Sequence, residues 1–222
     1  MTIDKQLPTA VIFDMDGVLI DSEPLHAASY VQAFAEIGLA ITLDDYYREI
    51  SMGHLAVSEL YAAMGGDMAL WHDISARKAV LTKEIMSQKG TLMPGVTRLL
   101  ESLKDAGIPM ALATSAGKRS LEIFMDKFDL RPYFKHIVTW EDVNAIKPDP
   151  RGFIVAAERL GVNCQDCAVL EDSPRGVLAA TRAGMKCIAI PNNSTRNGDF
   201  ATASLVVGSL TDVSLDMIRG LF

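Results

Sequence analysis

The stretch Thr9-Ala-Val-Ile-Phe-Asp-Met-Asp-Gly17 decides the fold of this chain. Its apolar part is short and rich in branched side chains, which is typical of a strand buried on both faces of a parallel sheet. It runs directly into two acidic residues and a glycine. Similar apolar runs recur along the chain at 108–114, 137–139, 167–170 and 187–190, with a sixth at 205–207.

Patterns of helical periodicity lie between these runs. Residues 96–103, 153–160 and 177–180 each place apolar side chains on one helical face, and a glycine follows each segment as a left-handed cap. Strands that alternate with helices predict an α/β fold with a doubly wound, mainly parallel sheet.

The segment after the first strand interrupts this alternation. Ser22 is a predicted N-cap, Pro24 lies in the first turn, and further helical patterns cover 55–64 and 74–86. A helical block inserted after the first strand predicts a separate small domain. The predicted domains are an α-helical cap, residues 21–90, and an α/β core, residues 1–20 and 91–222.

Composition narrows the class of protein. The chain has 222 residues, of which 49% are hydrophobic and 22% charged, and a net charge of -7. This acidic balance disfavours nucleic acids and anionic membranes as partners. No apolar run approaches the roughly 18 residues of a membrane span, and the N-terminus is unlike a signal peptide. We expect a cytoplasmic protein, monomeric or weakly homo-oligomeric, whose Cys164 and Cys167 are packing residues.

Two carboxylates, those of Asp14 and Asp16, close the first strand. At positions i and i+2 of an extended segment they point to the same side, and they repel each other unless a cation or a proton intervenes. Gly17 allows a sharp turn and the close approach of a ligand. The alternative interpretation is a solvated turn, in which Asp and Gly are common.

Polar groups also follow two later strands. Thr114, Ser115 and the small residues after them can donate side-chain and backbone hydrogen bonds to a phosphoryl group, although a helix N-cap is an equal alternative. Lys147 lies beside Pro148 and Pro150, which keep the chain extended and favour a role in neutralising charge over that of a surface lysine.

A second acidic pair, Glu171 and Asp172, closes the strand at 167–170. Carboxylate oxygens are ligands that suit Mg²⁺. As an alternative, Asp172 could cap the helix that begins at Pro174, but a cap does not explain Glu171. Ligands of open parallel sheets bind at the carboxyl ends of the strands, so these four segments predict one phosphate-handling site.

In this order the segments resemble the haloacid dehalogenase superfamily over essentially the whole chain. The stretch Phe13-Asp-Met-Asp-Gly-Val-Leu-Ile-Asp-Ser-Glu23 and the stretch Leu170-Glu-Asp-Ser173 are similar to the β-phosphoglucomutase-like branch, which acts mostly on small phosphorylated metabolites such as sugar phosphates. The resemblance implies that Asp14 is a nucleophile forming an aspartyl phosphate and that Asp16 is the general acid and base.

The resemblance also implies a ligand set. Mg²⁺ would be held by Asp14, the backbone carbonyl of Asp16 and Asp172, with Glu171 next to it or in its outer coordination sphere. Thr114 and Lys147 would grip the phosphoryl group, with backbone N–H groups near Met15 and Ser115. His26 lies where a sugar-phosphate mutase of this branch has a histidine that assists the acid/base aspartate, and a plain helix-surface residue is an equal alternative. Lys78 and Lys118 are candidates for contacts with a distal anion of the substrate.

One position departs from the mutases of this branch. A cap loop resembling Ser51-Met-Gly-His-Leu-Ala56 carries an arginine there, whereas this chain has Ala56, and Arg48 is the nearest arginine upstream. The prediction is therefore a Mg²⁺-dependent phosphatase acting on a small phosphate monoester, such as a sugar or polyol phosphate. Alternatives are a phosphomutase and, from another class, a phosphoaspartate regulatory or binding module; a dehalogenase would need neither Asp16 nor the second acidic pair.

Overall fold

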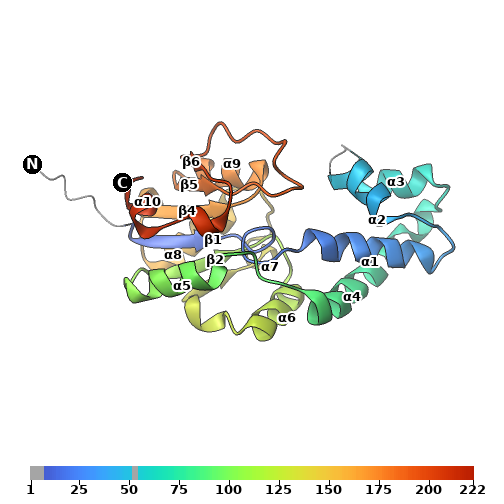
Figure 1. The fold of residues 1–222 in the computed structure, drawn as a ribbon, viewed down its shortest axis with the longest axis horizontal. Helices are drawn as coiled ribbons and strands as arrows, with labels where there is room; N and C mark the ends of the chain where they lie inside the picture. The colour runs from blue at the N-terminus through green and yellow to red at the C-terminus, as the bar shows by residue number, and fades with distance from the viewer. Residues whose placement is uncertain (1–7, 52–54) are drawn as a thin grey trace, which may run out of the picture. The chain divides into compact units, whose positions relative to one another are not determined.

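The computed structural model describes residues 8–51 and 55–222. The chain divides into two compact units, Met1–Ile20 with Leu92–Phe222, and Asp21–Thr91. The first unit is built of strands and helices, and the described residues of the second form helices and loops (Figure 1).

A parallel sheet lies at the centre of the α/β unit, with the order β3-β2-β1-β4-β5-β6 over the described residues. All six strands fall within or beside the predicted apolar runs, so the predicted parallel α/β fold is confirmed. The strands are β1 (Ala10–Phe13), β2 (Met110–Ala113), β3 (His136–Val138), β4 (Cys167–Glu171), β5 (Lys186–Ala189) and β6 (Leu205–Val206).

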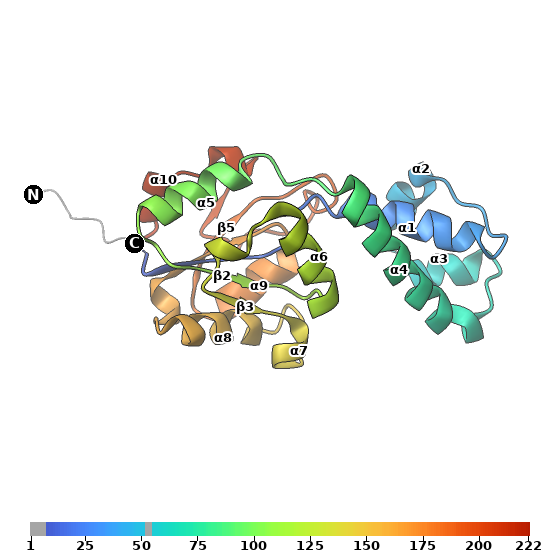
Figure 2. The same ribbon diagram turned by 90° about the horizontal axis from the view of Figure 1, so that it is seen from below.

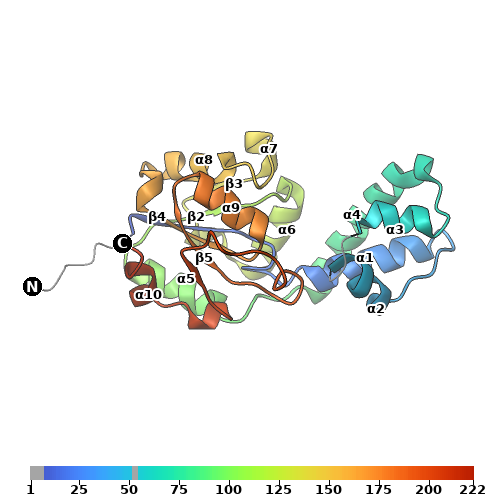
Figure 3. The same ribbon diagram turned by 90° about the horizontal axis from the view of Figure 1, so that it is seen from above.

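Helices cover both faces of this sheet. Figures 2 and 3 show α5 and α10 on one side of the sheet and α8 on the other. Glycines predicted as left-handed caps, such as Gly107 and Gly161, do have positive φ angles of 70° and 74°. The helices are α5 (Val96–Asp105), α6 (Lys118–Phe128), α7 (Trp140–Val143), α8 (Arg151–Leu160), α9 (Pro174–Arg182) and α10 (Leu215–Arg219), with 3-10 turns at Arg131–Tyr133, Cys164–Asp166 and Leu210–Asp212.

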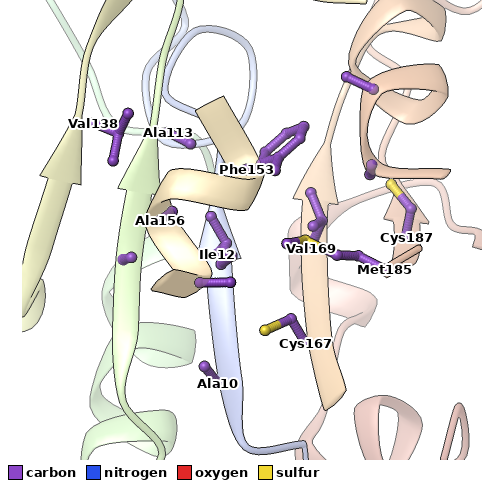
Figure 4. Packing of buried hydrophobic residues seen from close by; sticks show 14 of the residues in the cluster. Ala10, Ile12, Ala113, Val138, Phe153, Ala156, Cys167, Val169, Met185 and Cys187 are labelled. Atoms are coloured by element: carbon purple, nitrogen blue, oxygen red, sulfur yellow. The ribbon is translucent and has the colours of Figure 1, made fainter. Parts of the chain in front are cut away.

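Side chains of alternate strand residues pack against α8 and α9. Ala10 and Ile12 of β1 belong to this buried cluster together with Phe153 of α8 (Figure 4). Cys167 and Cys187 are part of the same cluster, and all three cysteines are free thiols, as expected of packing residues. Because strand side chains alternate, Val11 and Phe13 face the opposite layer.

The register brings the strand ends to one edge of the sheet. Phe13, the last residue of β1, pairs with Leu112 of β2 on one side and Leu170 of β4 on the other. The backbone N–H of Asp14 continues this pattern by donating to the carbonyl of Leu170 at 3.0 Å. The residues that follow β1, β2 and β4 therefore start from neighbouring points.

The helical unit is held together by aromatic side chains. Helices α1 and α4 pack along each other, and the buried rings of Phe34 and Tyr61 lie 5.4 Å apart between their centroids. Its elements are α1 (Glu23–Ala35), α2 (Leu43–Tyr46), a π-helical turn (Tyr47–Ser51), α3 (Val57–Ala63), a 3-10 turn (Met68–Leu70) and α4 (Trp71–Lys89).

Two local expectations for this unit need correction. Ser22 is not a side-chain N-cap, because its backbone is already helical and its hydroxyl makes no capping hydrogen bond. Helix α2 was absent from the prediction, since its single turn is too short to show a period. It forms through a capping box between Thr42 and Asp45. Within the described residues, no helix is long and apolar enough to cross a bilayer.

Candidate active site

Asp14 and Gly17 form the turn that leaves β1. Asp14 is buried, at 7% exposed, so its carboxylate does not belong to a solvated turn. Gly17 has a φ of +77°, and a Cβ built there would lie 2.2 Å from Oδ2 of Asp172. A glycine at this position therefore lets the β1 turn and the residue after β4 approach each other.

Glu171 and Asp172 have different surroundings although they are adjacent. The carboxylate of Glu171 is 1% exposed, and its Oε2 accepts hydrogen bonds from the backbone N–H and the hydroxyl of Ser173. Asp172 is 7% exposed and accepts a hydrogen bond from the side-chain amide of Asn192. Helix α9 is capped by Ser173, not by Asp172, so the alternative role of Asp172 as a helix cap is wrong.

Lys147 connects the two acidic segments. Its ammonium group donates to Oδ1 of Asp14 and to Oε1 of Glu171, and it lies 4.8 Å from the ring centroid of Phe153. The loop that carries it is held from α9, because Arg175 donates to the carbonyl of Lys147 and Arg182 to that of Pro148. Lys147 is therefore a buried, paired lysine and not a surface residue.

The charges in this cluster do not balance. Ligand atoms of Asp14, Glu171 and Asp172 lie within 4.8 Å of one another, and one ammonium group, that of Lys147, contacts two of them. Full ionisation would leave two uncompensated negative charges in a buried place. Burial raises the pKa of Asp172 to about 9 and that of Asp14 to about 7, the latter against the opposing charge of Lys147.

A divalent cation fits this donor set. The three carboxylates offer hard oxygen ligands, which Mg²⁺ prefers, and two positive charges would neutralise the excess. For Lys147, burial would lower the pKa, but the charges of Asp14 and Glu171 outweigh burial and raise it, so the lysine stays charged. The carboxylate of Asp16 is not part of the cluster and is partly exposed.

Thr114 lies at the end of β2 and faces the same region as Lys147. Both residues line one cavity together with Ser115 and Phe153. The hydroxyl of Thr114 accepts a hydrogen bond from the N–H of Ala116, and helix α6 begins after Gly117. Thr114 is therefore not the N-cap of α6, which corrects the alternative interpretation of this segment.

Comparison with known proteins identifies the family. The model of the family described as haloacid dehalogenase-like hydrolase matches residues 11–190. The chain belongs to this family. This hydrolase is 35% identical to a Drosophila melanogaster protein named "Probable pseudouridine-5'-phosphatase", with 92% of this chain and 90% of that protein covered.

Two further comparisons cover almost the whole hydrolase. It is 29% identical to hexitol phosphatase B of Escherichia coli K12, with 99% of this chain and 100% of the relative covered. The crystal structure of CbbY from Rhodobacter sphaeroides in complex with phosphate superposes with a TM-score of 0.78 at 27% identity, covering 93% of this chain and 96% of that one. The predicted family membership is thus confirmed.

Lys118 of the hydrolase contacts two acidic residues of the α/β unit. Its ammonium lies 3.3 Å from Oδ1 of Asp142, and its backbone N–H donates to both carboxylate oxygens of Glu141 at 3.1 Å. Glu141 thus occupies the N-terminal end of α6. The side chain of Lys118 is nevertheless 58% exposed, so a substrate anion could still reach it by displacing an exposed ion pair.

His26 and Lys78 are brought together in the helical unit. Nζ of Lys78 lies 2.9 Å from Nδ1 of His26 and 5.0 Å from the centroid of the Tyr30 ring. An ammonium group can only donate, so Nδ1 of His26 is the acceptor and its proton resides on Nε2. The two predicted substrate contacts therefore form one polar group, supported by an aromatic ring.

The cap-loop arginine of the mutases has no counterpart among the described residues near Ala56. Arg48 donates to Asp45 at 2.6 Å and to Glu49 at 2.8 Å, so its guanidinium is already paired on the surface of the helical unit. Ala56 opens helix α3 as its N-cap residue. Residues 52–54 of the same loop lie outside the described residues.

Sequence reasoning missed Asn192 and the two arginines of α9. Asn192 follows β5 closely, in the polar stretch Pro191-Asn-Asn-Ser-Thr195, and the rule that located the other strand-end groups applies to it equally. No comparable signal marks Arg175 or Arg182, because their partners are backbone carbonyls about 30 residues away in sequence.

Proposed function

We propose that this hydrolase is a Mg²⁺-dependent phosphatase that releases inorganic phosphate from a small phosphorylated metabolite, a sugar or polyol phosphate. The observation that carries the proposal is the buried cluster of Asp14, Glu171 and Asp172 against the single contacting ammonium of Lys147. The names of two relatives, "Probable pseudouridine-5'-phosphatase" and hexitol phosphatase B, support this class of substrate.

Asp14 is the proposed nucleophile. One carboxylate oxygen attacks phosphorus, the ester oxygen leaves with a proton from Asp16, and an aspartyl phosphate forms on Asp14. Water then attacks the same phosphorus while Asp16 takes up its proton, so that phosphate is released and both residues return to their starting state. The partial exposure of Asp16 supports this role, since a proton shuttle must reach the leaving group and water.

The other residues would hold the phosphoryl group and neutralise its charge. Thr114 and the backbone N–H groups near Met15 and Ser115 donate hydrogen bonds, and Lys147 contributes a fixed positive charge. Mg²⁺, held by Asp14, Asp172 and the backbone carbonyl of Asp16, with Glu171 nearby, would supply further neutralisation when bound.

The helical unit Asp21–Thr91 is the proposed specificity cap. Its paired His26 and Lys78 offer a cation and hydrogen-bond donors for the sugar or polyol part of the substrate. Ala56, at the position where the mutases of this branch carry an arginine, favours hydrolysis over a phosphomutase reaction, which needs a second phosphate grip on a bisphosphate intermediate.

The test is a phosphate-release screen over sugar phosphates, polyol phosphates and nucleotides, with Mg²⁺ and with a chelator. We expect Mg²⁺-dependent turnover of one group of substrates, abolished in Asp14→Asn and retained in Asp126→Asn, an exposed aspartate of α6 that serves as a matched control. Full activity of Asp14→Asn would refute the mechanism. Stoichiometric phosphorylation without turnover would indicate a regulatory module.

A further inference from the structure

Asn192 contacts a proposed metal ligand from outside the family motifs discussed above. It lies three residues after the end of β5, and its Nδ2 donates to Oδ2 of Asp172 at 2.7 Å. The carboxylate of Asp172 is buried, so a hydrogen bond to it is shielded from water and holds its orientation.

The orientation of the Asn192 amide is set by its own loop. Its Oδ1 accepts the backbone N–H of Ser194 at 2.9 Å, and its backbone N–H donates to the hydroxyl of Thr195 at 3.0 Å. A backbone N–H can only donate, so the carbonyl end of the amide must face Ser194 and the NH₂ end must face Asp172.

Gly17 completes the surroundings of this hydrogen bond. A Cβ built on Gly17 would lie 2.2 Å from Oδ2 of Asp172 and 2.7 Å from Nδ2 of Asn192. The backbone of the β1 turn therefore packs directly against the amide and the carboxylate. Asp172 cannot rotate about its side-chain bonds without losing the amide or colliding with this turn.

We propose that Asn192 is a positioning residue that holds Asp172 in the orientation required to bind the divalent cation. The proposal rests on the metal-dependent phosphatase function above. A neutral amide suits this task, because it orients the carboxylate without adding a positive charge that would compete with the cation. Lys147 differs from Asn192 in that its side chain is charged, and its ammonium group contacts Asp14 and Glu171.

The test is calorimetric titration of the whole chain with Mg²⁺ alone, without substrate. Asn192→Ala should raise the Kd for Mg²⁺ by about tenfold to hundredfold, the range seen when supporting residues of metal ligands are removed. Thr195→Val, which removes the hydroxyl that anchors Asn192, should shift the Kd in the same direction by less. Asn193→Ala changes the exposed neighbouring amide and should leave the Kd unchanged.

Turnover at increasing Mg²⁺ provides the second readout. In Asn192→Ala the half-saturating Mg²⁺ concentration should rise, whereas kcat at saturating Mg²⁺ should return towards the wild-type value. A Kd for Asn192→Ala equal to that of Asn193→Ala, or a lower Tm with an unchanged Kd, would overturn the positioning role. If the wild-type chain binds no Mg²⁺, the proposed function itself fails, and this result is separate from the comparison of variants.

Discussion

Gly176 and Glu171 provide the sharpest test of how the acidic cluster is packed. Gly176 is the third residue of α9, and a Cβ built there would lie 1.8 Å from Oε1 and 2.4 Å from Oε2 of Glu171. Contacts of a Cβ below 3.0 Å are essentially never seen, so Gly176→Ala requires the carboxylate to move by at least about 1.2 Å, the difference from 1.8 Å.

Neighbouring groups oppose this displacement of the carboxylate. Glu171 is 1% exposed, and its two oxygens are engaged by Lys147 on one side and Ser173 on the other. Overpacking of a buried site costs about 1–3 kcal/mol, and each weakened hydrogen bond to a charged group about 1.5–3 kcal/mol. Replacing glycine by alanine within a helix returns roughly 0.5–1 kcal/mol. We therefore expect Gly176→Ala to lower the free energy of unfolding by about 2–4 kcal/mol.

Gly152→Ala is the matched control. Gly152 is the second residue of α8, and a Cβ built there meets nothing within 4 Å. Both variants make the same change to the unfolded chain, so the difference between them reports the folded state. Urea unfolding should show Gly152→Ala as stable as the wild type or more so, by up to about 1 kcal/mol. A Gly176→Ala variant as stable as Gly152→Ala would refute the packing argument.

Three further predictions concern charge. Without Mg²⁺, stability should fall as pH rises from about 4 to about 9, because burial raises the pKa of Asp14 and Asp172 and the folded chain retains protons that the unfolded chain has released. Thermal unfolding over this range checks the slope, which should flatten in Asp172→Asn. Lys147→Met should reduce kcat for phosphate release by about 100-fold or more, measured at saturating Mg²⁺, because a fixed charge at the phosphoryl group is lost. Lys78→Ala should lower kcat/KM for the preferred sugar phosphate by about tenfold or more, because a hydrogen bond to the substrate is lost. Arg77→Ala, which removes an exposed ion pair with Glu36, is the control and should leave kcat/KM unchanged. Equal kinetics of the two variants would exclude Lys78 from substrate binding.

The centre of the sheet was predictable because β1, β2 and β4 are buried on both faces. Each strand must then be a continuous apolar run, and such a run ends sharply where the chain reaches the polar edge, as at Phe13 and Asp14. The parallel arrangement brings these ends together whatever the loops between them do. The positions of Asp14 and of the pair Glu171-Asp172 at one edge followed from this rule, and the register of β1 with β4 agrees with it. The expectation that Lys147 directly follows a strand was wrong, because helix α7 separates it from the end of β3.

Partners that come from distant segments were not predictable in the same way. The ion pair of Lys118 with Asp142 depends on how α7 packs beside α6, and nothing in the residues around Lys118 indicates it. The short elements of the helical unit, such as Leu43–Tyr46, are formed by capping hydrogen bonds and show no hydrophobic period. Likewise, Ser22 makes no side-chain capping hydrogen bond because its backbone is already helical at the start of α1.

Glu171 and Asp172 show most clearly what the position of a residue at a strand end does not predict. As adjacent residues at a strand end, they project to different sides, so their two carboxylates have different surroundings. Glu171 is turned towards Lys147, Ser173 and the glycine of α9, where a shift of its carboxylate is blocked. Asp172 is turned towards Gly17 and Asn192 and receives a neutral donor. A lysine takes up part of the charge beside Glu171, whereas no ammonium contact is found for Asp172 among the described residues. When the cluster is fully ionised, as it is when a cation is bound, the charge that no ammonium group contacts therefore lies on Asp172, and the demand for a cation is strongest there.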